Sequence, residues 1–423
     1  MADLNQLIVQ LGRQARLASR ALAGAPRDQI DAALKAMADE LLAAQAEILN
    51  ANAADVAAAR TAGQTPALLD RLTLDPKRLE ACAGGLRQVA LLPHPVGEVL
   101  REWTQPNGLH IAKIRVPIGI IGFIYESRPN VTCDAAGLCL KSGNAVILRG
   151  GSEALRSNQA IANALSRGLA GAGLPATAIQ LVPVADRDMV RLMGEATGVI
   201  DLLIPRGGRG LIETVVKHAR IPVIKHYDGI CALYVDRAAD LTMAESIAIN
   251  AKIARPGVCN AIETLLVHRE IAAPFLAQAG RTLAAQGVQL RADPAAFALL
   301  KDAGVSAVPA NNDDFHTEFL ALVLAVRIVD DAAAAIEHIE THSSHHTDTI
   351  VTEDKATAEK FLASVDSAVV LWNASTRFND GHEFGFGAEI GISTDKLHAR
   401  GPMGLEELTS YKYIVRGSGQ VRG

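Results

Sequence analysis

Hydrophobic residues recur at the spacing of an α-helix through about the first sixty residues of the chain. In two stretches the apolar positions lie three or four residues apart, which places them on one helix face: Leu4, Leu7, Ile8 and Leu11, then Ile30, Leu34, Met37 and Leu41. Gly24-Ala25-Pro26 separates the stretches, and proline is favoured near the start of a helix. We predict two amphipathic helices that pack on a core and assign them no chemistry.

Between residues 101 and 117 the apolar positions follow an extended pattern: Trp103, Leu109, Ile111, Ile114 and Val116. Pro106-Asn107-Gly108 is a turn signal inside this segment, so we predict a two-stranded hairpin. A hairpin is seldom stable alone and must pack on something. A partner subunit is one candidate.

From Ile118 onward, short β-branched runs alternate with helical stretches. The first runs are Ile118–Ile124, Ala145–Leu148, Ile179–Val182, Val199–Ile204 and Ile221–Ile224, with helices over Ser152–Leu169 and Gly207–Ala219. After Asp236 a second series predicts strands near Ile262–Val267, Ala325–Val329, Thr349–Val351 and Val369–Trp372. Continuous apolar strands separated by helices indicate parallel sheets covered on both faces. The fold class is therefore α/β, with two domains that meet near residues 228–236.

Composition excludes several classes of function. The 423 residues are 49% hydrophobic and 21% charged, which is typical of a globular protein. A net charge of -5 provides no basic field for nucleic acid or a membrane surface, and only 4% of residues are aromatic. No signal peptide and no run of eighteen apolar residues is evident. Five cysteines without a CxxC pair favour a reducing cytosol over a disulfide framework or a structural zinc site.

The sharpest local motif is Arg255-Pro256-Gly257-Val258-Cys259-Asn260, between a helical stretch and an apolar strand. Pro256 and Gly257 favour a tight turn that lifts Cys259 out of the regular framework. A thiol reacts as the thiolate, which the neighbouring Arg255 would favour. The alternative is a buried structural cysteine, because free cysteine is among the most buried residue types.

Two glycine-rich turns, Arg149-Gly150-Gly151-Ser152 and Arg206-Gly207-Gly208, each join a predicted strand to a predicted helix. Helix N-termini expose unpaired N–H groups that bind anions such as a nucleotide phosphate. Neither turn is a full GxGxxG motif, so a simple strand-to-helix turn stays open. Asn373, Arg377 and the glycine-rich stretch 384–391 also end or follow strands, where open α/β sheets place ligands.

Four histidines gather between residues 337 and 346: His338, His342, His345 and His346. Histidine clusters can bind metals, but this spacing matches no common zinc pattern and nearby acids can pair with the rings. We therefore expect no metal site.

Five motifs together resemble the aldehyde dehydrogenase superfamily, and more closely its branch that reduces gamma-glutamyl phosphate in proline biosynthesis. These motifs are YESRPNVTCDAAGLCL from Tyr125, KSGNAVILRGG from Lys141, RPGVCNAIETLLVH from Arg255, AIEHIETHSSHHTDTI from Ala335 and EFGFGAEIGISTDKLHARGPMGL from Glu383. The resemblance covers nearly the whole chain and implies the aldehyde dehydrogenase-like fold. It also implies reduction of L-glutamyl 5-phosphate through a cysteine thioester, with no metal.

The resemblance implies a role for each of several residues. Cys259 falls at the nucleophile, and Asn130 at the asparagine that holds the oxyanion. Cofactor binding falls to Arg149, Gly150, Gly151, Ser152, Arg206, Gly207, Gly208 and Glu318, with Glu318 at the nicotinamide ribose. The candidates for substrate binding are Arg255, Asn373, Arg377, Gly387 and Ser393, and which of them grip the phosphate or the amino-acid end stays open.

Two departures from the superfamily pattern refine this interpretation. His226 stands where hydrolytic members carry a water-activating glutamate, so an acyl-enzyme would resist hydrolysis, although His226 itself could act as a base. Ser152 stands where NAD-preferring members often carry a glutamate, so Ser152 and Arg149 favour NADP; the adjacent Glu153 weakens that preference.

The resemblance also predicts the domain organisation. We expect an NADP-binding domain over 1–100 and 118–228, oligomerisation strands at 101–117 and 408–423, and a catalytic domain over 229–407. We expect a cytoplasmic homo-oligomer, dimer or tetramer, with a transient contact to glutamate 5-kinase as an open question. The alternatives are an acylating enzyme that uses coenzyme A and a silent binding protein on the same scaffold.

Overall fold

The computed structural model describes residues 3–422; residues 1, 2 and 423, at the outer ends of the first expected domain and of the expected tail strand, lie outside the described part. The chain forms two compact units. The first contains the residues up to Lys225, together with Gly385–Gly391 and the segment from Met403 onward. The second contains His226–Phe384 and Ile392–Pro402. The two units are described separately below.

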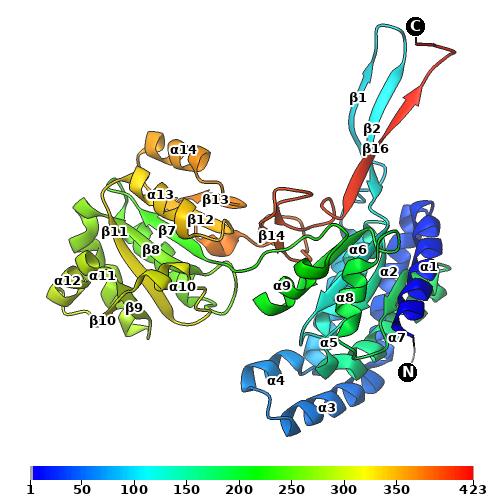
Figure 1. Ribbon diagram of the computed structural model, residues 1–423, viewed down its shortest axis with the longest axis horizontal. Helices are drawn as coiled ribbons and strands as arrows, with labels where there is room; N and C mark the ends of the chain where they lie inside the picture. The colour runs from blue at the N-terminus through cyan, green and yellow to red at the C-terminus, as the bar shows by residue number, and fades with distance from the viewer. Residues whose placement is uncertain (1–2, 423) are drawn as a thin grey trace. The chain divides into compact units, whose positions relative to one another are not determined.

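A four-stranded parallel sheet with the order β5-β4-β3-β6 lies at the centre of the first unit (Figure 1). Its strands are β3 (Ile120–Tyr125), β4 (Ala145–Arg149), β5 (Ile179–Leu181) and β6 (Leu202–Arg206). The helices are α1 (Leu4–Ala23), α2 (Arg27–Ala43), α3 (Gln45–Thr61), α4 (Pro66–Leu72), α5 (Pro76–Leu91), α6 (Asn130–Lys141), α7 (Leu155–Gly171), α8 (Asp188–Glu195) and α9 (Arg209–His218). Every residue of β3 is buried, as expected for a parallel strand covered on both faces.

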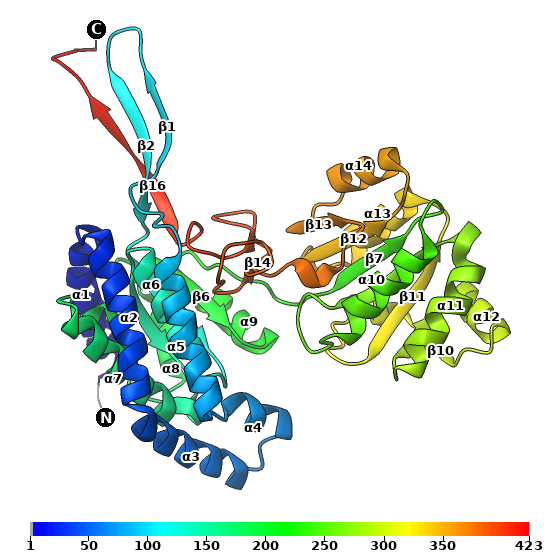
Figure 2. The same cartoon turned by 180° about the vertical axis from the view of Figure 1, so that it is seen from behind.

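The predicted hairpin is present, and the tail of the chain adds a third strand to it. Strands β1 (Val99–Thr104), β2 (His110–Pro117) and β16 (Thr409–Arg416) form an antiparallel ribbon with β2 in the middle. Figures 1 and 2 show this ribbon standing away from the helices of its unit. Tyr411, Tyr413 and Val415 are at least half exposed on it, so apolar surface is left uncovered.

The second unit is built on a seven-stranded parallel sheet with the order β10-β9-β11-β8-β7-β12-β13 (Figure 2). The strands are β7 (Cys231–Val235), β8 (Ile262–His268), β9 (Gln289–Ala292), β10 (Ala307–Pro309), β11 (Val323–Val329), β12 (Thr347–Val351) and β13 (Val369–Trp372). The helices are α10 (Leu241–Ile253), α11 (Ala272–Ala285), α12 (Pro294–Asp302), α13 (Ala332–His342) and α14 (Lys355–Ser364). A short pair, β14 (Ile392–Ser393) and β15 (Gly401–Pro402), completes the unit.

Alternate residues of β7 build the two cores of the second unit. Cys231, Leu233 and Val235 pack with α10, α11 and α12 on one face of the sheet. Ala232 and Tyr234 pack with α13 and α14 on the other. Because both faces are buried, every residue of β7 is buried and the strand sequence shows no polar alternation.

The predicted α/β fold class is therefore confirmed, with corrections to several elements. The run Ile221–Ile224 is not a strand: only Val223 forms a bridge, to Leu203, because Pro222 cannot donate a ladder hydrogen bond. The helix expected from Ser152 begins as a 3₁₀ turn, Ser152–Ala154, before α7. Strands β7, β9 and β10 were not predicted, and β7 lies in the segment interpreted as a boundary. None of the helices in residues 3–422 is long and apolar enough to span a membrane.

Candidate active site

The predicted site residues of the first unit, Asn130 for the oxyanion and the two glycine turns for the cofactor, follow the carboxyl ends of three adjacent strands. Asn130 begins α6 after β3, Gly150 follows β4, and Gly207 follows β6. The sheet register pairs Ile124 with Arg149 and Tyr125 with Arg206, so these ends lie level with one another. The strand order changes direction at β3, and ligands of open α/β sheets bind at such a point.

Arg149 is almost fully buried at this edge, and its guanidinium bridges to the next loop. Its Nη2 donates to the carbonyls of Ala185 at 3.3 Å and Asp186 at 3.4 Å. Burial lowers the pKa of Arg149, and the nearby Glu153 opposes that shift. Its Nε has no hydrogen-bond partner among the described residues. Part of this cation therefore remains available at the strand end.

Glu153, the residue that weakened the expected preference for NADP, is bound by its own unit. One carboxylate oxygen accepts from the backbone N–H of Ser127 at 2.8 Å and from its hydroxyl at 2.6 Å. Ser127 has a positive φ of 43°, so this contact also holds a strained loop residue. The carboxylate is thus directed toward the loop after β3.

The turn at Arg206–Gly208 binds a carboxylate of the same chain, that of Glu126. The N–H of Gly208, at the N-cap of α9, donates to the Glu126 carboxylate at 2.9 Å. A side chain at Gly207 would come within 2.5 Å of that same carboxylate, so any larger residue would displace the Glu126 side chain. The turn has the anion-binding character expected of a helix N-terminus, with one N–H already engaged.

Asn130 is exposed at the start of α6, where its amide can meet a ligand. Its Nδ2 donates to Asp134 one turn along the helix, at 3.2 Å. An amide nitrogen carries two hydrogens, so this contact leaves one donor.

In the second unit the site lies at the opposite end of the strands. Gly229, Cys259 and His346 all precede strands, which are β7, β8 and β12, and these three are neighbours in the sheet. Cys259 is half-buried, whereas Cys82, Cys133, Cys139 and Cys231 are all buried. The prediction that the turn lifts Cys259 out of the framework therefore agrees with its exposure.

Side chains rather than a sheet ladder hold the Cys259 turn in place. The carbonyl of Asn260 accepts from the Thr376 hydroxyl at 2.7 Å, and its Nδ2 donates to the Asn379 carbonyl at 3.0 Å. The Cys231 thiol donates to the Cys259 carbonyl at 3.1 Å. A side chain at Gly229 would come within 2.0 Å of that carbonyl oxygen, so close packing requires glycine there.

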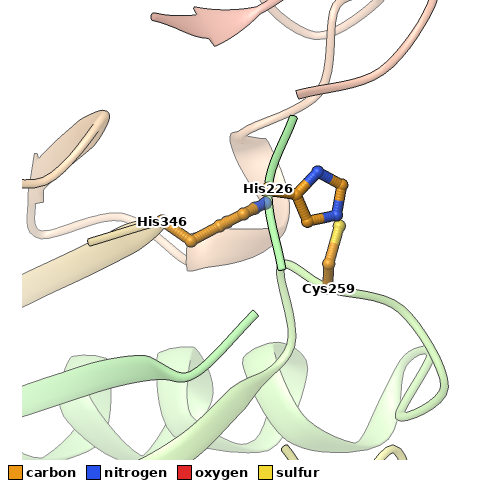
Figure 3. A group of neighbouring side chains, drawn as sticks. All are labelled: His226, Cys259 and His346. Atoms are coloured by element: carbon orange, nitrogen blue, oxygen red, sulfur yellow. The ribbon is translucent and has the colours of Figure 1, made fainter. Parts of the chain in front are cut away.

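The imidazole rings of two histidines lie close to the Cys259 sulfur (Figure 3). The Sγ atom and one ring nitrogen each of His226 and His346 lie within 4.8 Å of one another. His226 Nδ1 donates to the Ile392 carbonyl at 2.8 Å, and Figure 3 shows the other ring nitrogen beside the sulfur. Because a carbonyl only accepts, Nδ1 of His226 carries a proton, and Nε2 is the ring nitrogen directed to Cys259.

His346 is fully buried, with its ring edge-to-face against His226 at a centroid distance of 5.4 Å. Its Nδ1 lies 2.7 Å from the Thr347 hydroxyl, whereas Nε2 has no partner among the described residues. Burial lowers the pKa of His346 to about 4, against the opposing charges of Asp348 and Glu318. The ring is therefore neutral at pH 7.

Glu318 comes close to the same turn through the backbone. Its carboxylate accepts from the Gly229 N–H at 2.9 Å, and Gly229 packs on Cys259. Burial raises the pKa of Glu318, while the Gly229 N–H opposes that shift. The structure thus places the predicted ribose-binding carboxylate beside the predicted nucleophile.

Behind this turn lies a fully buried ion pair between Lys252 of α10 and Glu263 of β8. Lys252 also donates to the Ile262 carbonyl at 2.9 Å, and Glu263 accepts from the Leu320 N–H at 3.3 Å. Burial lowers the pKa of Lys252 and raises that of Glu263 to about 7. The pair therefore connects the strand after Cys259 to the loop that carries Glu318.

Comparison with known proteins places the chain in a family. A model of the aldehyde dehydrogenase family matches residues 8–297. Gamma-glutamyl phosphate reductase of Opitutus terrae is 54% identical over 422 residues, covering 100% of this chain and 99% of that relative. The chain belongs to the aldehyde dehydrogenase family.

Solved structures of the aldehyde dehydrogenase family agree. The crystal structure of gamma-glutamyl phosphate reductase from Thermotoga maritima matches with a TM-score of 0.96 and 44% identity, over 98% of this chain and 100% of that one. An acetylating aldehyde dehydrogenase from Geobacillus thermoglucosidasius shares the fold at 17% identity and a TM-score of 0.69. The resemblance inferred from the five motifs is therefore confirmed.

As an aldehyde dehydrogenase-type oxidoreductase, the protein uses a nicotinamide cofactor and acts on a small molecule. The carboxyl edge of the first unit suits such a cofactor. Arg149 Nε and Asn158 Nδ2 are both buried there without a hydrogen-bond partner in the described chain. Buried polar atoms of this kind need an explanation, and an additional ligand at the site is one.

The five predicted substrate residues separate into different places. Arg377 lies beside the nucleophile turn, because Asn260 contacts its backbone at 3.5 Å. Ser393 is buried next to Ile392, which holds His226. Arg255 is exposed at the start of the Cys259 turn.

The other two predicted substrate residues do not join this group in the second unit. Asn373 follows β13 at the carboxyl edge of the sheet, where its amide is bonded to both backbone groups of Thr352. Gly387 belongs to the first unit and lines a pocket of about 140 Å³ with Asp134 and Val89.

The histidine cluster read from the sequence is divided in the structure. His338 bonds to Arg327 at 3.2 Å and His342 to His316 at 2.8 Å, whereas His346 alone is grouped with Cys259. Sequence reasoning missed this position because α13 ends at His342 and a turn redirects the chain into β12. A histidine directly before a buried strand was the signal available.

Proposed function

We propose that this protein reduces L-glutamyl 5-phosphate to L-glutamate 5-semialdehyde and phosphate with NADPH, in proline biosynthesis. The full-length relatives at 54% identity carry the name of that reductase. The observation that carries the proposal is a half-buried Cys259 whose sulfur lies close to two imidazoles, at the position of the family nucleophile. A catalytically silent scaffold would have no need of this arrangement.

In the proposed reaction the Cys259 thiolate attacks the acyl carbonyl and phosphate leaves. The thioester that forms divides one difficult step into two easier ones. The Asn130 amide and the Cys259 N–H hold the oxyanion, and one such donor contributes roughly 10²–10³-fold in rate in a well-studied protease. When bound, the nicotinamide cofactor supplies hydride to the acyl carbon. Cys259 is then the leaving group that releases the aldehyde.

Protection of the thioester from water follows from His226. A histidine replaces the family's water-activating glutamate, and its Nδ1–H is held by the Ile392 carbonyl. Its ring lies beside the Cys259 sulfur (Figure 3). An intermediate that hydrolyses slowly is what a phosphate-releasing enzyme requires.

The preference for NADPH rests on the edge of the first unit. Arg149 provides a positive charge beside Gly150, Gly151 and Ser152, and the Glu153 carboxylate is engaged by Ser127. Gly207 and Gly208 allow the backbone of their turn to approach the cofactor closely. Glu318 binds the nicotinamide ribose.

The candidates for gripping the substrate are Arg255, Arg377 and Ser393, near Cys259. Asn373 and Gly387 stay in the proposal on resemblance alone. We assign residues 1–100 and 118–228 to cofactor binding and residues 229–407 to catalysis. The β1-β2-β16 ribbon, with its exposed tyrosines, is assigned to assembly of a homo-oligomer. The cytoplasm is the expected compartment, and contact with glutamate 5-kinase belongs to the same proposal.

The reverse reaction tests the function. Oxidation of glutamate 5-semialdehyde should require added phosphate or arsenate, because His226 replaces the water-activating glutamate and phosphate is then the group that takes the acyl chain from Cys259. Turnover without phosphate would indicate a hydrolytic dehydrogenase, and turnover with coenzyme A in its place would indicate the acylating alternative. NADP⁺ reduction followed at 340 nm, with each acceptor in turn, separates the three outcomes.

A further inference from the structure

The second unit gathers one thiol and two imidazoles from three segments that are distant in sequence. The donor atoms of His226, Cys259 and His346 lie within 4.8 Å of one another. They come from the segment before β7, the turn before β8 and the first residue before β12. Among the divalent cations of biology, zinc is the one that a site of cysteine sulfur and imidazole nitrogen typically binds.

Both imidazoles are oriented as ligands are. His226 Nδ1 donates to the Ile392 carbonyl at 2.8 Å, and His346 Nδ1 lies 2.7 Å from the Thr347 hydroxyl, which can accept its proton. Metal-binding histidines usually have their second ring nitrogen held by an oxygen in this way, which fixes the tautomer and the ring direction. In each ring, Nε2 is then the nitrogen that would bind the metal ion.

His346 supplies a second, independent observation. It is fully buried, yet its Nε2 has no partner in residues 3–422. A buried polar atom without a partner is uncommon in a folded protein and indicates a bound water or ion, or a functional role. Figure 3 shows the ring of His346 directed toward His226 and the Cys259 side chain. A cation between the three donors would satisfy this nitrogen.

The required movement is small. Zinc bonds of about 2.0–2.1 Å to nitrogen and 2.3 Å to sulfur in a tetrahedral site place the donors about 3.3–3.6 Å apart. From separations of up to 4.8 Å, the donor atoms must approach one another by at most about 1.2–1.5 Å. Three protein ligands leave a fourth position for water or a substrate group.

We propose that Cys259, His226 and His346 form a zinc-binding site that blocks the nucleophile. Binding forms a Zn–S bond at Cys259 and releases the thiol proton to solvent, with no change of oxidation state. A sulfur bound to zinc cannot attack an acyl phosphate, so occupancy switches the enzyme off reversibly. The switch rests on the proposed function; the binding site itself does not.

The test uses the whole protein after treatment with a chelator, without substrate or cofactor. Cobalt(II) serves as the optical probe, because a thiolate ligand gives a charge-transfer band and a tetrahedral site gives intense visible absorption. Zinc affinity is measured by competition with a chromophoric chelator. The rate of iodoacetamide alkylation reports Cys259, since the other four cysteines are buried.

We expect wild-type protein to bind a single zinc equivalent and to show the thiolate–cobalt band. Cys259→Ser should lose the band. His226→Ala and His346→Ala should each weaken zinc by more than about tenfold, since loss of even an outer contact to a metal ligand costs 10–100-fold. Saturating zinc should slow alkylation at least tenfold, and EDTA should restore it.

His342→Ala is the matched control, because His342 pairs with His316 away from Cys259 and should leave zinc affinity unchanged. Absence of zinc uptake, an undiminished band in Cys259→Ser, or unaltered alkylation with zinc bound would each overturn the proposal. His226 is only half-buried, so His226→Ala keeps the test valid if His346→Ala fails to fold. Because no measurement uses substrate, failure of the reductase function would leave these results unaffected.

Discussion

The two units place their functional residues at opposite ends of parallel strands. In the first unit the predicted site residues follow β3, β4 and β6, at the carboxyl edge. In the second unit Gly229, Cys259 and His346 precede β7, β8 and β12, at the amino edge. The general rule for ligands in open α/β sheets therefore describes the first unit and not the second.

The difference reflects what each edge offers. At the carboxyl edge a strand turns directly into a helix N-terminus, so backbone N–H groups and a few glycines make an anion site. At the amino edge helices end before the strands begin, as α10 does at Ile253 before the Cys259 turn. That turn is held by side chains such as Asn260 and Thr376. The proposed nucleophile is therefore fixed in position by several specific side-chain contacts. Four substitutions test this difference between the two units.

Removing the nucleophile should have the largest effect. Cys259→Ala should lower NADPH oxidation with acyl phosphate by about 10³-fold or more, because no covalent intermediate forms. The first unit is untouched, so NADPH binding measured by fluorescence should persist. Cys82→Ala, at a buried cysteine of the first unit, should keep most activity. Normal turnover by Cys259→Ala would end the thioester proposal.

Breaking the buried ion pair should destabilise the second unit. Lys252→Met leaves Glu263 buried without its cation and should cost about 3–5 kcal/mol in the free energy of unfolding. The double variant Lys252→Met with Glu263→Leu should recover most of that loss, since it removes the uncompensated charge. Urea denaturation followed by circular dichroism measures both. If the single and double variants are equally stable, the pair does not support the Cys259 strand as argued.

Crowding the nucleophile turn should reduce catalysis more than stability. A methyl group at Gly229 would come within 2.0 Å of the Cys259 carbonyl oxygen, and displacement of the turn by about 1 Å costs about 10²-fold in rate. Gly84→Ala is the matched control, because no atom lies within 4 Å of its added methyl and α5 should gain about 0.5–1 kcal/mol. Steady-state kcat and thermal melting compare them. Equal kcat for the two variants contradicts the role of Gly229.

The smallest effect is expected at the edge of the first unit. Arg149→Ala should weaken NADPH relative to NADH by about tenfold, the scale of one charge-assisted contact at 1.4 kcal/mol. Arg149→Lys keeps the charge and should retain part of the preference. The ratio of kcat/KM for the two cofactors is the measurement. Equal losses with both cofactors would show that Arg149 does not read the 2'-phosphate.

Local patterns in the sequence predicted much of the framework. Apolar runs such as those of β3 and β8 and the turn of the β1-β2 hairpin were legible because each is a local property of the chain. The strand β7 was missed, since Cys231–Val235 is short, buried on both faces and lacks alternation. The strand predicted at Ile221–Ile224 was wrong, because Pro222 cannot donate a ladder hydrogen bond although its neighbours are apolar.

The candidate site was only partly visible in the sequence. Cys259 was singled out by Pro256 and Gly257 beside it, a signal within six residues. His346 was grouped with His338 and His342, its neighbours in sequence, although the structure places it with Cys259. The role of Gly229 could not be foreseen, because the atom that forbids a side chain there belongs to Cys259.

The sequence alone determined the class of fold, the tight turn around Cys259 and the glycine turns after β4 and β6, because hydrophobic period and backbone freedom are properties of neighbouring residues. Only the tertiary structure decided the order of the strands, and with it which loops share an edge. The meeting of His226, Cys259 and His346 depends on β7, β8 and β12 lying side by side. Strand order is set by long-range packing of helices on both faces of the sheet, which no local pattern encodes.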